Sequence, residues 1–535
     1  MPVQTIADAI VDRLAARGVK RMFGVPGGDC NLDIIEAGAR KGVEFILTRG
    51  ETAAAIMASV SAELTGVPGV VMTTRGPGLA SVANGAAYAS LDRAALMIIA
   101  DNYEAGLDHV SHQKIYQASL LRPVVKQASC LSSDDPAAEV DTLLDTASAQ
   151  PPGAVYLEIT GERIRSNAPV SQGRTAPPVG GTASIDAKAL DAAGELLSRA
   201  TRPVIIAGLQ ARSKSAAGAL RRLATNCSCP VLLTYKAKGA VSDTEPHAVG
   251  FYIDGAAERP VVEASDLVVL YGFDPIEGPA TKWRFKKPTI ELTEHKFDHP
   301  LVKADVSIVG DIAAAAERLA VFRKAPAYEL RELLQMKSDL RAKAAAQGEN
   351  ISPQAVVDAA WKVLPRDARI TVDAGAHMLP VLHLWQTPDP NGALVSRGLA
   401  TMGFALPAAI ASALVEPQRP VIAFTGDGGL MMCASELATA AQNGCKLIVI
   451  VFNDSCLTLI EAKQRRRQLP NAGVNLSDVN FASVAKGYGC AGFRVETLEE
   501  LTAALAAALA EDRPVVVDVV VDPSAYHQQI IALRG

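Results

Sequence analysis

Two acidic turns in the last third of the chain carry residues that could bind a metal ion. Gly426, Asp427 and Gly428 follow one apolar stretch, a helix is predicted over residues 432–443, and Asp454 follows the next apolar stretch. Because parallel strands in α/β proteins end at a common edge, where ligands bind, we expect the two turns to lie close together. Carboxylate oxygens and glycine N–H groups at such an edge suit a Mg²⁺ ion that holds a diphosphate.

This arrangement resembles the cofactor-binding motif of the thiamine diphosphate (ThDP) enzymes, the superfamily of 2-oxo acid decarboxylases and acetolactate synthases. The resemblance implies that Mg²⁺ is bound by the side chains of Asp427 and Asp454 and by the backbone carbonyl of Cys456. It also implies that Gly428 and Gly429 donate N–H groups to the diphosphate. The family commonly has asparagine where Asp454 stands, and an aspartate there adds negative charge around the ion.

A glutamate near the N-terminus is the predicted proton-transfer group. Glu51 follows a predicted strand end and begins a helix of small residues, which is similar to the strand–turn–Glu–helix element of the family. In ThDP enzymes this glutamate hydrogen-bonds N1′ of the pyrimidine, and the 4′-amino group of the coenzyme then acts as the base. The protein therefore orients chemistry that belongs to the cofactor. Without this context, the helix dipole alone would explain a carboxylate at this position.

Two further segments of the last third resemble family elements that shape and hold the cofactor. One matches Gly-x-Met-Gly-x-Leu-Pro-Ala-Ala, which implies that Met402 is the apolar wedge between the two rings and that the Ala400 carbonyl accepts from the 4′-amino group. The other occupies the place of a Val-Gly-Gln-His diphosphate turn. Gly375 and His377 match this turn, but Ala376 replaces the glutamine, which puts one phosphate contact in doubt.

Features of the first third resemble acetolactate synthases and pyruvate oxidase-like enzymes. Gly28 ends a Phe-Gly-Val-Pro-Gly-Gly turn, Asn84 belongs to a Gly-Pro-Gly…Asn loop, and His112 with Gln113 precedes a Pro-Val-Val-Lys segment. The resemblance implies that these four residues bind the substrate, with Gln113 near the reacting carbonyl. Residues 274–277 resemble the catabolic, FAD-free acetolactate synthases, and the Arg-Phe-Asp-Asp-Arg signature of the flavin-containing enzymes is absent. We therefore do not expect FAD.

The helix after the second acidic turn carries an unexpected lysine. Leu457 begins this helix and is implied to contact the substrate, whereas Lys463 stands where biosynthetic acetohydroxyacid synthases have a tryptophan that selects the acceptor. A lysine at this place could bind an anionic group such as a carboxylate or a sulfonate. Alternatively, Lys463 points outward and belongs to the exposed basic run that ends at Arg467. The sequence leaves both explanations open.

The elements that must position these residues form three α/β units. Apolar strands alternate with helices throughout, which predicts three doubly wound parallel-sheet domains. Their predicted bounds are 1–184 for a pyrimidine-binding domain, 185–327 for a central domain and 350–535 for a diphosphate-binding domain. A linker rich in proline, glycine and threonine is predicted over 171–183, and a charged helical linker over 328–348. In the family, the first and third domains meet across a subunit interface, which implies a homodimer or homotetramer.

Composition excludes several other classes of protein. The chain has 535 residues, of which 49% are hydrophobic and 20% charged, so it can bury large cores. A net charge of −5 without a dense basic run argues against a nucleic-acid partner. We expect no membrane span and no signal peptide, and the eight scattered cysteines do not suggest a disulfide framework. These features favour a cytoplasmic enzyme.

The sequence therefore predicts a ThDP- and Mg²⁺-dependent enzyme that decarboxylates a small 2-oxo acid. The acetolactate synthase-like outcome is carboligation of the resulting enamine to a second carbonyl. One alternative is a plain decarboxylase, in which a proton captures the enamine. Another is a 2-hydroxyacyl-CoA lyase or oxalyl-CoA decarboxylase-like enzyme, which would need a basic CoA-binding patch that the central unit does not clearly show. A scaffold protein without activity is disfavoured because Glu51 and the metal-binding motif are intact.

Overall fold

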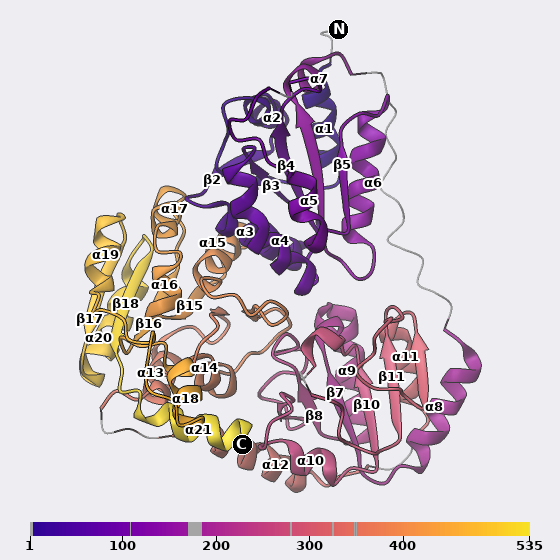
Figure 1. Cartoon of the computed structure of the whole chain (residues 1–535). Helices are drawn as coiled ribbons and strands as arrows, with labels where there is room; N and C mark the ends of the chain where they lie inside the picture. The colour runs from indigo at the N-terminus through magenta and orange to yellow at the C-terminus, as the bar shows by residue number, and fades with distance from the viewer. Residues whose placement is uncertain are drawn as a thin grey trace. The chain divides into compact units, whose positions relative to one another are not determined.

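The structure is a computed structural model that describes residues 4–107, 109–168, 185–278, 281–323, 326–346, 348 and 350–535. These residues form three six-stranded sheets in which every pair of neighbouring strands is parallel (Figure 1). The prediction of three α/β domains is thus confirmed. Two compact units are present: the first sheet with residues 406–417 and 433–445 forms one, and the second and third sheets form the other. The predicted linker 171–183 lies outside the described residues.

The first sheet has the strand order β2-β1-β3-β4-β6-β5. Its strands are β1 (Arg21–Gly24), β2 (Glu44–Leu47), β3 (Gly69–Thr73), β4 (Leu96–Asn102), β5 (Gln127–Cys130) and β6 (Ala154–Thr160). Its helices are α1 (Ile6–Ala16), α2 (Cys30–Lys41), α3 (Glu51–Thr65), α4 (Pro77–Leu91), α5 (Gln117–Leu121), α6 (Pro136–Ser148) and α7 (Gly161–Arg165). The central strands β3 and β4 are almost wholly buried, as is typical of apolar parallel strands covered on both faces. Because α3 begins at Glu51, just after β2, this carboxylate lies at the carboxyl end of a strand.

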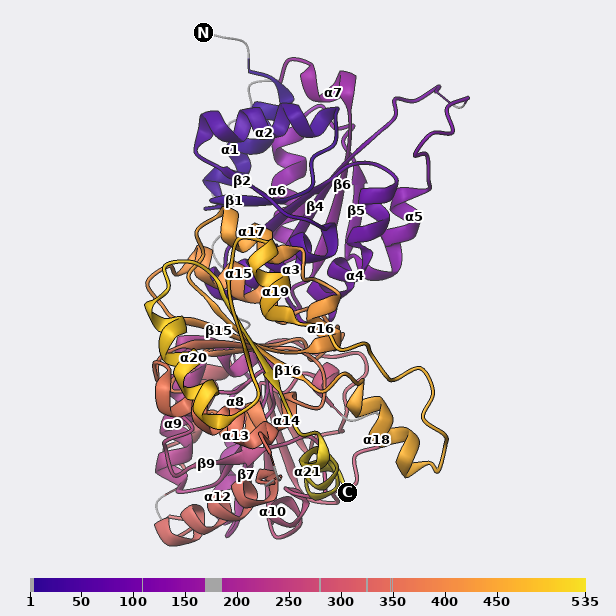
Figure 2. The ribbon, with the colours of Figure 1, turned by 90° about the vertical axis from the view of Figure 1, so that its left-hand side faces the viewer.

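The third sheet repeats the order of the first, as β14-β13-β15-β16-β18-β17. Its strands are β13 (Arg369–Val372), β14 (Ala393–Val395), β15 (Val421–Gly426), β16 (Ile448–Asn453), β17 (Ala491–Val495) and β18 (Val515–Val520). The helices of this part of the chain are α13 (Pro353–Val363), α14 (Met378–Leu384), α15 (Ala405–Val415), α16 (Asp427–Met431), α17 (Glu436–Gln442), α18 (Thr458–Arg466), α19 (Phe481–Gly487), α20 (Leu498–Ala510) and α21 (Ser524–Arg534). Strands β15 and β16 lie side by side, with Gly426 paired to Phe452 (Figure 2). Their carboxyl ends therefore lie at the same edge, as predicted.

The predicted helix 432–443 corresponds to α17, which begins four residues later, at Glu436, and a separate short helix, α16, precedes it. Helix α16 begins at Asp427 itself, and the chain turns between α16 and α17. The N–H of Met432 bonds to the Gly429 carbonyl, and the N–H of Glu436 bonds to the Cys433 carbonyl. These bonds span three residues rather than four, so they tighten the chain and end the first helix.

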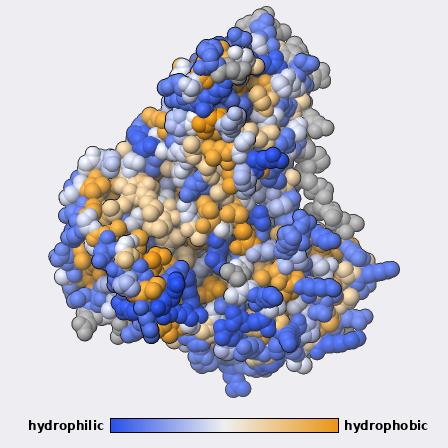
Figure 3. All heavy atoms as spheres, viewed as in Figure 1, coloured by the Kyte–Doolittle hydropathy of each residue, from blue (hydrophilic) through white to orange (hydrophobic). Residues whose placement is uncertain are grey.

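The second sheet has the order β12-β11-β10-β7-β8-β9, the arrangement of dinucleotide-type folds. Its strands are β7 (Pro203–Ala207), β8 (Val231–Leu233), β9 (Ala248–Phe251), β10 (Leu267–Tyr271), β11 (Thr289–Thr293) and β12 (Val306–Val309). The helices of this part of the chain are α8 (Ala187–Arg199), α9 (Lys214–Cys227), α10 (Arg259–Glu263), α11 (Ile312–Leu319) and α12 (Leu330–Ala344). The surface over α18, in the third-sheet part of the same unit, is strongly hydrophilic (Figure 3).

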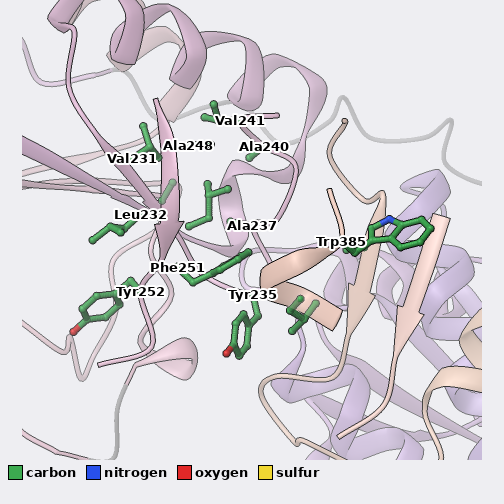
Figure 4. Packing of buried hydrophobic residues seen from close by; sticks show 14 of the residues in the cluster. Val231, Leu232, Tyr235, Ala237, Ala240, Val241, Ala248, Phe251, Tyr252 and Trp385 are labelled. Atoms are coloured by element: carbon green, nitrogen blue, oxygen red, sulfur yellow. The ribbon is translucent and has the colours of Figure 1, made fainter. Parts of the chain in front are cut away.

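The second and third sheets share one continuous apolar core. The core runs from β8 and β9 through Tyr235 and Phe251 to Trp385, which follows α14 (Figure 4). The rings of Tyr235 and Phe251 lie 5.4 Å apart, and that of Phe251 lies 4.9 Å from His383.

Among the described residues, no helix is long and apolar enough to cross a membrane.

Candidate active site

The carboxyl ends of β13, β15 and β16 border a cavity with a volume of about 410 Å³. Strand order reverses between β13 and β15, and such reversal points are the usual ligand sites of open α/β sheets. The cavity is lined by all the predicted cofactor and substrate residues of this part of the chain: Gly375, His377, Ala400, Met402, Gly426, Asp427, Gly428, Gly429, Asp454, Cys456, Leu457 and Lys463. The fold thus brings together residues from four separate segments.

Asp427 and Asp454 are suited to binding a divalent cation in this cavity. Oδ1 of Asp427 accepts the N–H of Gly428 at 2.6 Å, whereas its Oδ2 is buried without a hydrogen-bond partner among the described residues. Burial raises the pKa of Asp454 to about 7, and the nearby charge of Asp427 also raises it. A buried carboxylate with an unpaired oxygen, next to a half-buried one, is costly without a cation. An oxygen-only donor set fits Mg²⁺.

The backbone around Cys456 is arranged to supply a third oxygen. The described residues contain no group of three or more metal-binding side chains, so a site here needs a backbone ligand. Ser455 adopts a left-handed conformation with φ 53°, and the N–H of Cys456 bonds to Oδ1 of Asp454 at 3.1 Å. Cys456 lies opposite Asn475 in an isolated antiparallel β-bridge. The hydrogen bonds of this bridge are made by the residues on either side, from the N–H of Leu457 to Val474 and from the N–H of Leu476 to Ser455. The Cys456 carbonyl therefore points away from Asn475 and stays outside the ladder.

His377 offers the cavity a neutral ring with an unpaired nitrogen. Its ring stacks on Phe452 with 5.4 Å between centroids, and its Nε2 is buried without a partner among the described residues. Burial lowers the pKa of His377 to about 3, so the imidazole is uncharged at neutral pH. A Cβ added at Gly426 would lie 3.2 Å from Nδ1, so the glycine leaves room for the ring. A neutral imidazole has one N–H, and the Asp373 backbone carbonyl already accepts a bond from this ring, so Nε2 is the nitrogen left facing a ligand.

Asp373 is a buried residue whose importance the sequence did not reveal. Its Oδ2 accepts the N–H of Gly403 at 3.1 Å and the hydroxyl of Thr425 at 3.0 Å, while its Oδ1 accepts the N–H of Phe404 at 3.2 Å. Burial raises its pKa to about 6. These bonds hold the turn that carries Met402 against the end of β15. A signal was present, since Asp373 is an acid directly after an apolar strand.

The same turn has a demanding backbone. Ala400 has a φ of 54° and Gly403 a φ of 75°, so a non-glycine residue is held in the left-handed region. The Met402 side chain reaches Gly428, where an added Cβ would lie 3.4 Å from Cε of Met402 and 2.7 Å from a methyl carbon of Leu457. Such strain persists only when surrounding bonds fix it, and Asp373 supplies two of them, to the N–H groups of Gly403 and Phe404.

Glu51 lies in the first unit, half-buried at the start of α3. A Cβ added at Gly78 would lie 3.0 Å from Oε1 of Glu51, so Gly78 leaves space for the carboxylate. The turn before Glu51 is anchored by Glu436, which is buried and accepts the N–H of Arg49 at 3.0 Å. Sequence reasoning missed this role of Glu436, because the two partners are 387 residues apart in the chain.

A second cavity, of about 590 Å³, lies in the first unit and contains two of the predicted substrate residues, Gly28 and Gln113. Its wall is fixed by ion pairs: Arg75 contacts Asp29 at 2.7 Å, and the same carboxylate contacts a second arginine. The other two predicted substrate residues of this unit, Asn84 and His112, are exposed and do not line this cavity.

Three family models match the chain in order. The N-terminal TPP binding domain of thiamine pyrophosphate enzymes matches residues 4–120, the central domain of these enzymes matches residues 190–319, and their C-terminal TPP binding domain matches residues 373–519.

Curated relatives are similar over nearly the whole chain. An acetolactate synthase of Bacillus subtilis is 28% identical, with 97% of this chain and 93% of the relative covered. The acetolactate synthase large subunit of Parasynechococcus marenigrum is 30% identical, with 96% and 88% covered. A probable 2-ketoarginine decarboxylase of Pseudomonas aeruginosa is 28% identical, with 93% and 90% covered.

Proposed function

The chain belongs to the thiamine pyrophosphate enzyme family and is a ThDP-dependent enzyme of the acetolactate synthase type, and from this we propose its reaction. It decarboxylates a small 2-oxo acid with the help of Mg²⁺ and joins the remaining fragment to a second carbonyl compound. Similarity to acetolactate synthases over nearly the whole chain supports this reaction. The observation that carries the cofactor site is the unpaired, buried Oδ2 of Asp427 beside Asp454.

In this proposal, residues of the second unit hold the diphosphate end of the cofactor. Asp427, Asp454 and the Cys456 carbonyl bind Mg²⁺. The N–H of Gly429 donates to the diphosphate, the N–H of Gly428 joins it once Oδ1 of Asp427 turns to the metal, and the His377 ring lies beside a phosphate oxygen. ThDP supplies, when bound, the carbanion chemistry that lets the carboxylate of a 2-oxo acid leave as CO₂. The protein binds and orients the cofactor and the substrate, and it excludes water from them.

The ring end of the cofactor is held by three further groups. Met402 acts as the wedge that fixes the angle between the two rings, and the Ala400 carbonyl accepts from the 4′-amino group. Glu51 holds the proton at N1′ of the pyrimidine. General acid–base groups contribute roughly 10²–10⁴-fold to turnover. Loss of Glu51 should therefore reduce the turnover rate most while the cofactor stays bound.

We assign the pyrimidine-binding role to a domain of residues 1–184, a central role to 185–327 and the diphosphate-binding role to 350–535. Since Glu51 belongs to the first domain and Asp427 to the third, the proposed enzyme is a homodimer or homotetramer with active sites at the subunit interface. A two-fold interface then gives two equivalent sites. Gly28 and Gln113 line the substrate side. We propose a cytoplasmic enzyme without FAD.

A plain decarboxylase is the second candidate, and one observation favours it. The probable 2-ketoarginine decarboxylase is similar to this chain over almost the same range as the acetolactate synthases. In that case a proton, rather than a second carbonyl compound, reacts with the fragment left after CO₂ departs.

The experiment is to supply the purified protein with ThDP and Mg²⁺ and to measure CO₂ release and products from pyruvate, 2-oxobutyrate and benzoylformate. Acetolactate-type products support carboligation, and aldehydes support plain decarboxylation. Glu51→Gln should lower the rate, while Glu499→Gln, a matched change at an exposed position of α20, should not. Absence of CO₂ release from every 2-oxo acid tried, including sulfopyruvate and 2-oxoglutarate, would refute the proposal.

A further inference from the structure

The cavity at the end of the third sheet has a cationic wall that the cofactor does not explain. Among the described residues, its only acidic lining residues are Asp427 and Asp454, which the proposed function assigns to Mg²⁺. Lys463 of α18 and Arg534 of α21 also line the cavity. Arg397 lines it too, but one of its nitrogens donates to the Glu277 carbonyl at 3.2 Å.

Lys463 is placed close to the metal-binding turn and has no acidic partner among the described residues. Helix α18 is fixed at its start, where the hydroxyl of Thr458 donates to Oδ2 of Asp454 at 2.5 Å. Lys463 lies five residues further on, roughly 7 Å along the helix axis. The positions three and four residues away on the helix hold no acid, and Glu461, two residues away, is engaged by Arg465 at 2.7 Å. The lysine charge is therefore available to a ligand.

Arg534 is half-buried and likewise has no carboxylate partner among the residues that the structure describes. Its charge lies near Tyr235 and His383: burial, then the charge of Lys238 and then that of Arg534 lower the pKa of His383 to about 3. A half-buried guanidinium without an anion is costly, because it has lost part of its hydration without gaining a partner. An anionic ligand would remove this cost.

Helices α18 and α21 are joined, so the two cations belong to one wall. Nη1 of Arg466 donates to the Gly535 carbonyl at 2.7 Å, which ties the end of α18 to the end of α21 (Figure 2). Earlier on α21, Tyr526 lines the cavity near the metal-binding carboxylates, whose charges raise its pKa in addition to burial. Eight residues separate Tyr526 from Arg534, roughly 12 Å along the helix. The cationic wall thus starts near the metal turn and extends away from it.

We propose that one of the two carbonyl substrates carries a second anionic group, a carboxylate or a sulfonate, which binds between Lys463 and Arg534. This inference rests on the proposed function and names the substrate class of the same site. A charge-assisted hydrogen bond from each cation would hold the tail while the carbonyl end remains near the metal turn. Both cations also stand in the last turn of a helix, where the dipole favours them, but that effect does not require either to line a cavity.

The experiment compares pairs of 2-oxo acids that are matched in shape and differ in tail charge: sulfopyruvate against 4,4-dimethyl-2-oxopentanoate, and 2-oxoglutarate against 5-methyl-2-oxohexanoate. Each is supplied as donor and as acceptor to wild type, Lys463→Met, Arg534→Met and the control Arg467→Met, whose exposed arginine does not line the cavity. We expect kcat/KM to favour the charged member. Arg534→Met, which removes a half-buried cation, should lower that preference roughly tenfold or more, and Lys463→Met, which removes an exposed one, roughly two- to fivefold. Lys463→Arg should restore most of it.

ThDP affinity, measured by titration without substrate, separates the possible outcomes. Unchanged affinity with a lost charge preference supports the inference. Equal loss of kcat/KM for both members of a pair, or a fall in ThDP affinity, would show that the cations serve the fold or the diphosphate and would overturn it. CO₂ release without any charge preference would also overturn it and leave the proposed function standing. Absence of CO₂ release from every compound would instead refute the proposed function.

Discussion

Replacing Asp373 with asparagine should change the pH dependence of stability in a way that identifies its buried carboxylate. In the native protein the carboxylate accepts bonds from the N–H groups of Gly403, Phe404 and Ala374. Asparagine keeps the shape but replaces one oxygen with an NH₂ group. On the Oδ2 side, the hydroxyl of Thr425 can rotate to accept, whereas the N–H of Gly403 would face another donor. A stranded buried donor costs about 1–3 kcal/mol.

The magnitude of the pH effect follows from the pKa. Burial raises the pKa of Asp373 from 3.8 to about 6, so the native state retains a proton that the unfolded chain releases between these values. The contribution to stability is full below pH 3.8 and is lost as the pH rises through 6. It amounts to roughly 3 kcal/mol in total, of which roughly 1–2 kcal/mol falls between pH 5 and pH 8. Asparagine does not titrate and lacks this contribution.

Urea unfolding of the cofactor-free protein at several pH values would measure the difference. Fluorescence of Trp361 and Trp385, which pack edge to face at 5.1 Å, reports on the unit that contains Asp373. The free energy of unfolding of wild type, minus that of Asp373→Asn, should fall by roughly 1–2 kcal/mol from pH 5 to pH 8. Asp367→Asn, at an exposed site of the same segment, should show no such trend. Parallel pH curves for wild type and Asp373→Asn would refute the reasoning.

Four further predictions concern the cofactor and the assembly. Glu51→Gln should bind ThDP with near-normal affinity yet lose roughly 10²–10⁴-fold in kcat, and a wild-type kcat would reject its role. Burial raises the pKa of Asp454 to about 7, so below pH 7 a proton competes with Mg²⁺ for this carboxylate. Mg²⁺-dependent retention of ThDP, measured by equilibrium dialysis, should therefore weaken by up to about tenfold per pH unit below 7. Retention that does not change from pH 8 to pH 6 would contradict this. Mixing Glu51→Gln chains with Asp427→Ala chains should restore part of the activity through hybrid sites, and verified mixed oligomers that stay inactive would count against a shared site. Purified protein should show no flavin absorbance, since residues 274–277 replace the flavin-associated signature, and a yellow preparation would overturn that expectation.

The sequence by itself determined the three α/β units and the strand ends that carry the chemistry. Apolar runs that end in glycine and acid, as before Asp427 and Asp454, encode both a strand and the turn that follows it, because these are local properties of the chain. The adjacency of β15 and β16 then followed from the general rule that parallel strands end at one edge. The helical segment between them was predicted less accurately. The break between α16 and α17 depends on a local change from i−4 to i−3 backbone hydrogen bonds, which no residue pattern predicts.

Tertiary structure alone decided which distant residues support the site. Asp373 bonds to Gly403 across 30 residues, and Glu436 bonds to Arg49 across 387, so neither partner can be read from spacing. The pair of Glu461 and Arg465 has the i, i+4 spacing of a helix and could be read from the sequence, but only the fold showed that Lys463 lines the cavity and that Arg534, from a helix at the far end of the chain, lines it too. Such pairings depend on how helices and sheets pack, which local patterns do not specify, whereas strand ends and turns depend on the residues within them.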